Sequence, residues 1–166
     1  MYWLYDKDDG IHDLCLHGHT TVQIGMESFS FDATISATAL YLLKSLTNDH
    51  IAGKEIQMLP CCGHCIYADE TGEDVFIIGC DQGIDWTVRH RGNIVEFITE
   101  SGTKTYLPLE IYQKRVYQFA DRIEAFYQRC PVKMLPTDPL DQEGYIVFWK
   151  EWHRRRGIHS IETHEI

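Results

Sequence analysis

One segment near the end of the chain predicts a long amphipathic helix, and this helix constrains the fold more than any other feature. Apolar side chains recur along residues 109–129 at intervals of four, three, four and three positions: Tyr112, Val116, Phe119, Ile123 and Phe126. This spacing places them in one stripe on a single helical face, with mostly polar and charged side chains on the rest. Pro131 follows, and proline ends a helix. We therefore expect a helix over residues 109–129 that buries one face.

Most of the chain before this helix has the pattern of β-strands. Residues 14–24 alternate between apolar and polar side chains, which is the period of a half-buried strand. Gly25 allows a turn into a second strand, ESFSF, so a hairpin is expected. The run VFIIG at residues 75–79 is continuously apolar and predicts a central strand. Further strands are expected at residues 2–5, 55–59, 65–68, 85–90, 93–100 and 103–108.

Two more segments have helical spacing. Residues 35–48 carry an apolar stripe, and residues 145–157 predict a shorter helix that ends at Gly157. Residues 134–144 are expected to form a loop, although the pair Asp138-Pro139 could also open a helix. We therefore predict an α+β fold in which a largely antiparallel sheet of about six to eight strands packs against two or three helices. Residues 1–157 are expected to form a single domain and residues 158–166 a C-terminal tail.

The charge of the chain is strongly asymmetric. Of the formal net charge of −10, residues 1–100 contribute 16 acidic and five basic side chains, whereas residues 101–166 are close to balance. An acidic surface repels nucleic acid phosphates and accelerates encounter with basic proteins. Sequence-independent nucleic acid binding is therefore not expected. A basic protein is the partner that this charge favours.

The sequence also bears on the compartment. No apolar run approaches the ~20 residues that cross a bilayer. The first residues, MYWLYDKDDG, lack the basic and apolar regions of a signal peptide. We therefore expect a cytoplasmic protein without membrane contact, in which the six cysteines are reduced thiols.

The stretch PCCGHC at residues 60–65 concentrates potential metal ligands. Cys62 and Cys65 form a C-x-x-C pair, and a turn with this spacing can present two ligands to a tetrahedral zinc ion. A zinc site, structural or in a hydrolase, would use Cys62, His64 and Cys65 with His17 and His19, two histidines on one strand face. Cys15, Cys80 and Cys130 are other possible sources of ligands. The competing interpretation is a bend in which the cysteines act as small apolar side chains, and it is favoured because there is no second C-x-x-C pair.

Acidic residues cluster in turns. If these turns lie on one edge of the sheet, they form a negative surface for a basic partner, since loop tips carry binding function more often than strands. The alternative is a set of solvated turns. The partner-binding residues that we predict from this clustering, with Trp86 as an aromatic anchor, are Asp69, Glu70, Glu73, Asp74, Asp81, Asp85 and Trp86.

The segment FWKEWHRRR combines aromatic side chains with Arg154, Arg155 and Arg156. Arginines beside aromatics can bind nucleic acid. Basic residues in a last helical turn also complement the helix dipole, and Trp149 and Trp152 at i and i+3 are expected to pack inward. The role of the three arginines is left open by the sequence.

The sequence contains no glycine-rich phosphate loop, no G-x-S-x-G elbow and no H-E-x-x-H helix. In size, acidity and lack of catalytic motifs the chain resembles the small immunity proteins that bacteria encode beside polymorphic or contact-dependent toxins. This resemblance implies a non-catalytic inhibitor without a cofactor, which binds a cognate basic toxin domain of nuclease type. The alternative function is that of a zinc-binding Cys/His protein centred on Cys62 and Cys65.

Overall fold

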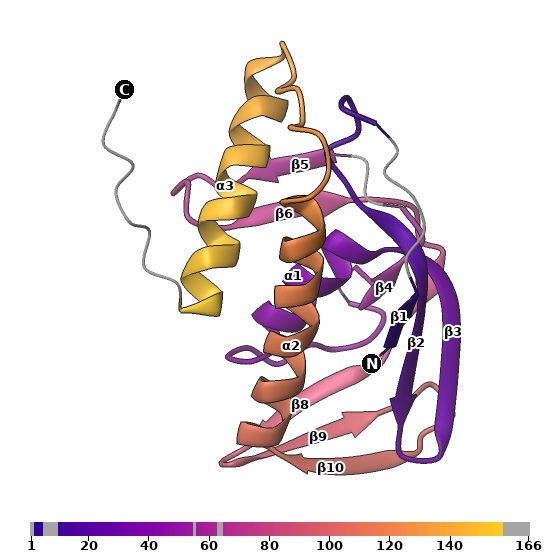
Figure 1. Ribbon diagram of the computed structural model, residues 1–166. Helices are drawn as coiled ribbons and strands as arrows, with labels where there is room; N and C mark the ends of the chain where they lie inside the picture. Colours follow the sequence, from indigo (N-terminus) through magenta and orange to yellow (C-terminus); the bar gives the residue numbers. More distant parts are fainter. Residues whose placement is uncertain (1, 5–9, 55, 63–64, 158–166) are drawn as a thin grey trace.

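Ten strands and three helices make up the part of the chain that the computed structural model describes, namely residues 2–4, 10–54, 56–62 and 65–157 (Figure 1). The tail predicted for residues 158–166 lies outside this part. The strands are short, and most of them pair antiparallel with the strand that precedes or follows them in the sequence. The three helices begin at residues 35, 109 and 139. The α+β class expected from the sequence is confirmed.

The first sheet is built from the alternating segment near the start of the chain. Its order is β1 (Tyr2–Leu4), β2 (His17–Ile24) and β3 (Glu27–Thr34), all antiparallel. Along β2 buried residues alternate with more exposed ones, as the period of two predicts. Gly25 has a φ of 61°, a conformation that glycine adopts without strain, and it forms the turn of the β2–β3 hairpin.

The second three-stranded sheet has the order β10 (Lys104–Pro108), β9 (Ile94–Ile98) and β8 (Thr87–Arg91). Two antiparallel pairs complete the strands: β4 (Leu59–Pro60) with β7 (Gly83–Ile84), and β5 (Cys65–Ala68) with β6 (Val75–Ile78). Within the described residues the strands thus form four small sheets, where the sequence suggested one larger sheet.

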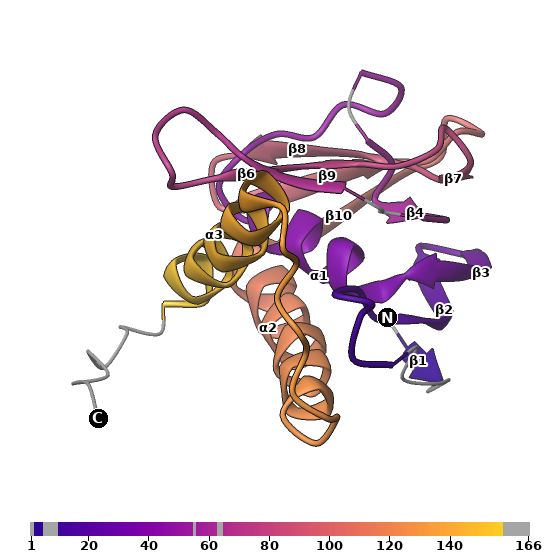
Figure 2. The same ribbon diagram turned by 90° about the horizontal axis from the view of Figure 1, so that it is seen from above.

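Helix α1 (Ile35–Lys44) lies at the centre of the fold (Figure 2). Eight of its ten residues are buried, and it contacts both α2 (Leu109–Tyr127) and α3 (Pro139–Arg156). The stripe predicted on the long helix is confirmed for Tyr112, Val116, Phe119 and Ile123, which are buried, whereas Phe126 is only partly buried. Of the two tryptophans expected to pack inward, Trp152 on α3 is fully buried and Trp149 is partly buried against the core.

Helix α3 begins earlier than residue 145. Asp138 caps its N-terminus, and the carboxylate oxygen Oδ1 accepts hydrogen bonds from the backbone N–H groups of Leu140 (2.9 Å) and Asp141 (3.3 Å). Pro139 occupies the first helical position, where its missing N–H costs nothing. The Asp138-Pro139 pair is therefore the start of the helix. Across the described residues, none of the helices is both long enough and apolar enough to pass through a membrane.

Candidate interaction face and thiol cluster

The β5–β6 hairpin crosses α3 and has one face packed against this helix (Figure 1). Ile66, Val75 and Ile77 are on this inner face and are buried. The backbones approach closely, because a Cβ built on Gly144 of α3 would lie 1.7 Å from the carbonyl oxygen of Ile66. Glycine is therefore the residue that allows α3 to support the hairpin.

The acidic turn of this hairpin, residues 69–74, is organised by Asp69. The carboxylate of Asp69 accepts hydrogen bonds from the hydroxyl of Thr71 (2.7 Å) and from the backbone N–H groups of Glu73 (3.0 Å) and Asp74 (3.2 Å). The Thr71 hydroxyl and these N–H groups lower the pKa of Asp69 below its ordinary value, although partial desolvation opposes them. Asp69 thus holds the turn in shape, while Glu70 at its tip is exposed.

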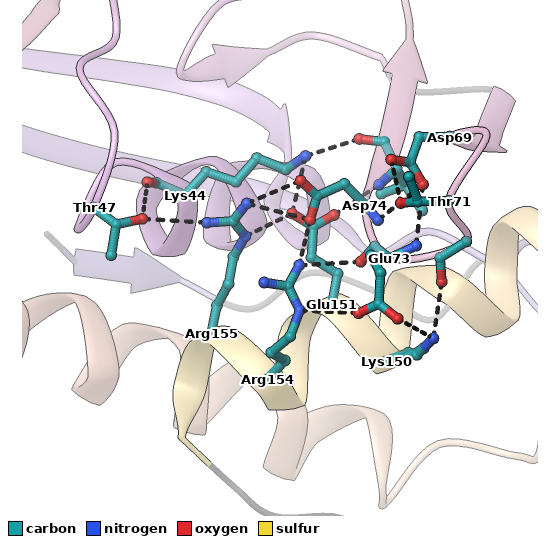
Figure 3. Close-up of polar contacts among 12 residues, drawn as sticks. Lys44, Thr47, Asp69, Thr71, Glu73, Asp74, Lys150, Glu151, Arg154 and Arg155 are labelled. Carbon is teal, nitrogen blue, oxygen red and sulfur yellow. Dashed lines mark hydrogen bonds and ion pairs between the residues drawn. The ribbon is translucent and has the colours of Figure 1, made fainter.

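Glu73 and Asp74 face the basic end of α3 (Figure 3). Glu73 lies 2.7 Å from Lys150 Nζ and 3.7 Å from Arg154 Nε, and Asp74 pairs with both Arg154 and Arg155. Partial burial raises the pKa of Asp74, but the Arg155 guanidinium and its neighbours outweigh this, so the net pKa is lowered. The two carboxylates predicted to face a partner are therefore engaged by cations of their own chain.

A buried carboxylate, Glu151, joins this network to the core (Figure 3). Its side chain is fully buried, and Oε1 lies 3.0 Å from Lys44 Nζ and 2.6 Å from Arg155 Nε. Oε2 accepts a hydrogen bond from the backbone N–H of Val75 (2.8 Å), and Lys44 donates to the carbonyl of the same residue (2.8 Å). Side chains of α1 and α3 thus satisfy both backbone groups of Val75 on the free edge of β6, where a neighbouring strand would otherwise pair.

The third arginine, Arg156, binds a different helix. Its Nε and one terminal nitrogen contact the two oxygens of Asp121 at 2.5 and 2.8 Å, and its guanidinium lies 4.1 Å from the ring centre of Tyr117. Each arginine of the helix end therefore has an intramolecular carboxylate partner. These contacts give the arginine-rich end a structural role that needs no nucleic acid.

Asp85 and Trp86 also have internal roles. Asp85 Oδ1 lies 2.7 Å from His50 Nε2 and accepts hydrogen bonds from the backbone N–H groups of Met58 (3.2 Å) and Trp86 (3.0 Å). Trp86 is 2% exposed, so it is a core residue and cannot serve as a surface anchor in this conformation. The expectation of an anchor there is corrected by its burial against the core. Asp81, in contrast, is exposed.

The outer face of the β5–β6 hairpin carries exposed apolar side chains that the sequence did not single out. Phe76 is 65% and Ile78 is 55% exposed. In the antiparallel register Tyr67 is paired with Phe76 and Cys65 with Ile78, so these four residues share one face. The apolar run VFIIG predicted a central strand. Among the described residues β6 instead pairs with β5 alone, and the outer face of this two-stranded sheet leaves Phe76 and Ile78 exposed. Exposed apolar side chains that are neighbours on one face of a sheet are candidate contacts for a partner protein.

Three cysteine side chains converge beside the base of the hairpin. The Sγ atoms of Cys61, Cys62 and Cys80 all lie within 4.8 Å of one another, and the three residues are partly buried. Hydrogen bonds from Cys61 and Cys62 lower the pKa of the Cys80 thiol, and the bond with Cys80 raises the pKa of Cys61 to about 12. These are the residues of the described chain that could hold a metal ion.

This cluster shares only Cys62 with the zinc ligands predicted from the sequence. Cys65 begins β5 and is paired with Ile78, and His64 lies outside the described residues. The histidines of β2 lie on the first sheet, each against an aspartate: His17 Nε2 with Asp13 Oδ2 at 3.3 Å, and His19 Nδ1 with Asp32 Oδ1 at 2.6 Å. Cys80, which the sequence offered only as one of several possible sources of ligands, is the third member of the cluster.

Comparison of the chain with protein-family models, with curated proteins and with solved structures finds no significant match.

Proposed function

We propose that the protein is a non-catalytic binding domain that neutralises a basic, nuclease-type partner protein, as small immunity proteins do, and that it acts in the cytoplasm. The observation that supports this proposal is the exposed pair Phe76 and Ile78 on the outer face of β6. Complete burial of such a side chain stabilises a complex by roughly 1.5–3 kcal/mol before other costs. A protein partner that covers this face gains that free energy.

The contact is expected on the face of the hairpin and not on the β6 edge. The edge groups of Val75 are occupied by Glu151 and Lys44, and the Tyr41 hydroxyl donates to the carbonyl of Ile77 (3.2 Å). A partner strand would have to displace these side chains before it could pair with β6. Side-chain contacts across the outer face require no such displacement.

Charge selects the partner. Exposed Glu70 lies in the turn at the tip of the hairpin and exposed Asp81 comes three residues after β6 ends, so negative side chains flank β6 on both sides in the sequence. An apolar centre with a charged rim is the usual arrangement of a protein interface, in which the centre gives affinity and the rim gives association rate. A basic partner surface complements this rim, and the net charge of −10 adds long-range attraction.

The test uses the protein encoded by the gene directly upstream as the probe, because immunity proteins are encoded beside their toxins. Expression of the probe alone should arrest growth, and co-expression of this chain should restore it. The two purified proteins should form a 1:1 complex whose association slows with added salt while dissociation changes little. A probe that is not toxic, or a toxic probe that neither binds nor is neutralised, would contradict the proposal.

A further inference from the structure

Backbone pairing brings the three cysteines together from two separate segments. In the β4–β7 pair Leu59 is opposite Ile84 and Pro60 is opposite Gly83, and the N–H of Cys61 continues the ladder to the carbonyl of Gln82 at 3.1 Å. Cys61 and Cys62 therefore leave β4 at the point where the segment containing Cys80 enters β7. A Cβ on Gly83 would lie 2.6 Å from the carbonyl oxygen of Leu59, so glycine permits this close approach.

The spacing of the sulfur atoms fits a small thiophilic metal ion. Zinc–thiolate bonds of about 2.3 Å in a tetrahedral arrangement place the sulfurs about 3.8 Å apart. The observed Sγ atoms already lie within 4.8 Å of one another. Side-chain rotations that move the sulfurs by about 1 Å or less therefore bring them to this distance. The N–H of Cys80 donates to Cys62 Sγ at 3.1 Å, and such a bond stabilises a thiolate ligand and fixes its direction.

We propose that Cys61, Cys62 and Cys80 bind one zinc ion through their three sulfurs, with the fourth tetrahedral position taken by water or a small ligand. Each thiol that coordinates the ion does so as a thiolate and releases its proton to the solvent. Zinc accepts thiolate ligands and undergoes no redox change, so the site needs no oxidant or reductant. This proposal is independent of the partner proposed above.

The position of the site indicates a structural effect. Cys62 precedes β5 by three residues and Cys80 follows β6 by two, so an ion bound by both closes the base of the β5–β6 hairpin. The opposite end of the hairpin is held by the Asp69 turn and by α3. Bound metal is therefore expected to slow amide hydrogen exchange in the hairpin and to raise the melting temperature of the protein.

The experiment titrates the full chain with cobalt(II) and zinc(II) under a non-thiol reductant. Cobalt should produce a thiolate-to-metal charge-transfer absorption that saturates at one ion per chain and disappears when zinc is added. Cys61→Ser, Cys62→Ser and Cys80→Ser should each weaken zinc binding by more than the ~10–100-fold that loss of an outer hydrogen-bonding partner costs. The matched controls, Cys65→Ser and Cys130→Ser, should bind zinc with an affinity within about threefold of that of the wild type.

A second readout does not depend on the variants. Alkylation followed by mass mapping should show that zinc protects the three cluster thiols and leaves the reactivity of Cys65 unchanged. The proposal is overturned if the reduced wild-type protein takes up no cobalt. It is equally overturned if Cys65→Ser weakens binding as much as Cys80→Ser does, because the ligands would then be those of the C-x-x-C pair.

Discussion

Replacement of Glu151 tests whether the buried ion network holds the β5–β6 hairpin against α3. Glu151→Ala removes the carboxylate from two cations whose side chains are only 22% (Lys44) and 10% (Arg155) exposed. Loss of one partner of a buried ion pair costs about 3–5 kcal/mol, because the remaining charge is buried without compensation. The backbone N–H of Val75 loses its acceptor as well, which alone costs about 1–3 kcal/mol.

These terms overlap, so we predict that Glu151→Ala lowers the free energy of unfolding by about 3–5 kcal/mol. Since a domain has only about 5–15 kcal/mol of stability, this variant is at risk of unfolding. Glu151→Gln keeps the shape of the side chain and one oxygen acceptor. Its NH2 group, which is a donor, must then face either the cations or the Val75 N–H, which are donors as well. Its expected cost is about 1–3 kcal/mol.

The assay is urea denaturation followed by tryptophan fluorescence and circular dichroism, because Trp152 lies one residue from the site. Glu73→Gln is the matched control. It removes the same charge from an ion pair with Lys150 in which both side chains are 50% exposed, and such pairs contribute about 0–1 kcal/mol. If Glu151→Gln is no more destabilising than Glu73→Gln, the buried network does not hold the hairpin and the reasoning fails.

Two further predictions concern the same contact. Gly144→Ala should lower the free energy of unfolding by about 3 kcal/mol or more, because its Cβ would collide with the Ile66 carbonyl. The control Glu143→Ala, on the exposed side of α3, should change the free energy of unfolding by less than about 0.5 kcal/mol. Equal melting temperatures for the two variants would refute the close approach. The stability difference between wild type and Asp74→Asn should be largest near neutral pH. Partial burial raises the pKa of Asp74, but Arg155 and its neighbours lower it overall, so its contribution is present above the ordinary value of 3.8 and is lost as the pH falls through the lowered pKa. A difference that is constant from neutral pH to about pH 3 would contradict this assignment.

Local patterns in the sequence predicted the elements whose periodicity is strong. Four of the five residues of the predicted stripe are buried as expected and the fifth, Phe126, is partly buried. The alternation in β2 places Val22 and Ile24 in the core. The run VFIIG could not reveal that β6 has one exposed face, because four successive apolar residues give no period from which to read a face. The exposure of Phe76 and Ile78 depends on which elements cover the strand, and that is a property of the tertiary fold.

The thiol cluster and the buried network were hidden for the same reason. Cys80 is 18 positions from Cys62, and only the β4–β7 pairing shows that they meet. Glu151 stands among charged residues in a helix and reads as a surface side chain, although it is fully buried. The acidic residues Glu73 and Asp74 were identified as a cluster, but their cations come from a helix more than 70 positions away.

The central claim, that the outer face of the β5–β6 hairpin binds a basic protein, is tested most directly by the affinity of one variant pair. Phe76→Ala and Met26→Ala both truncate an exposed apolar side chain, the first on the proposed face and the second, 98% exposed, on the β2–β3 turn. Calorimetric titration of each with the upstream-encoded probe should show at least a ~30-fold loss for Phe76→Ala, the effect of a hot-spot residue, and less than a ~3-fold change for Met26→Ala. Equal affinities for the two variants would contradict the account.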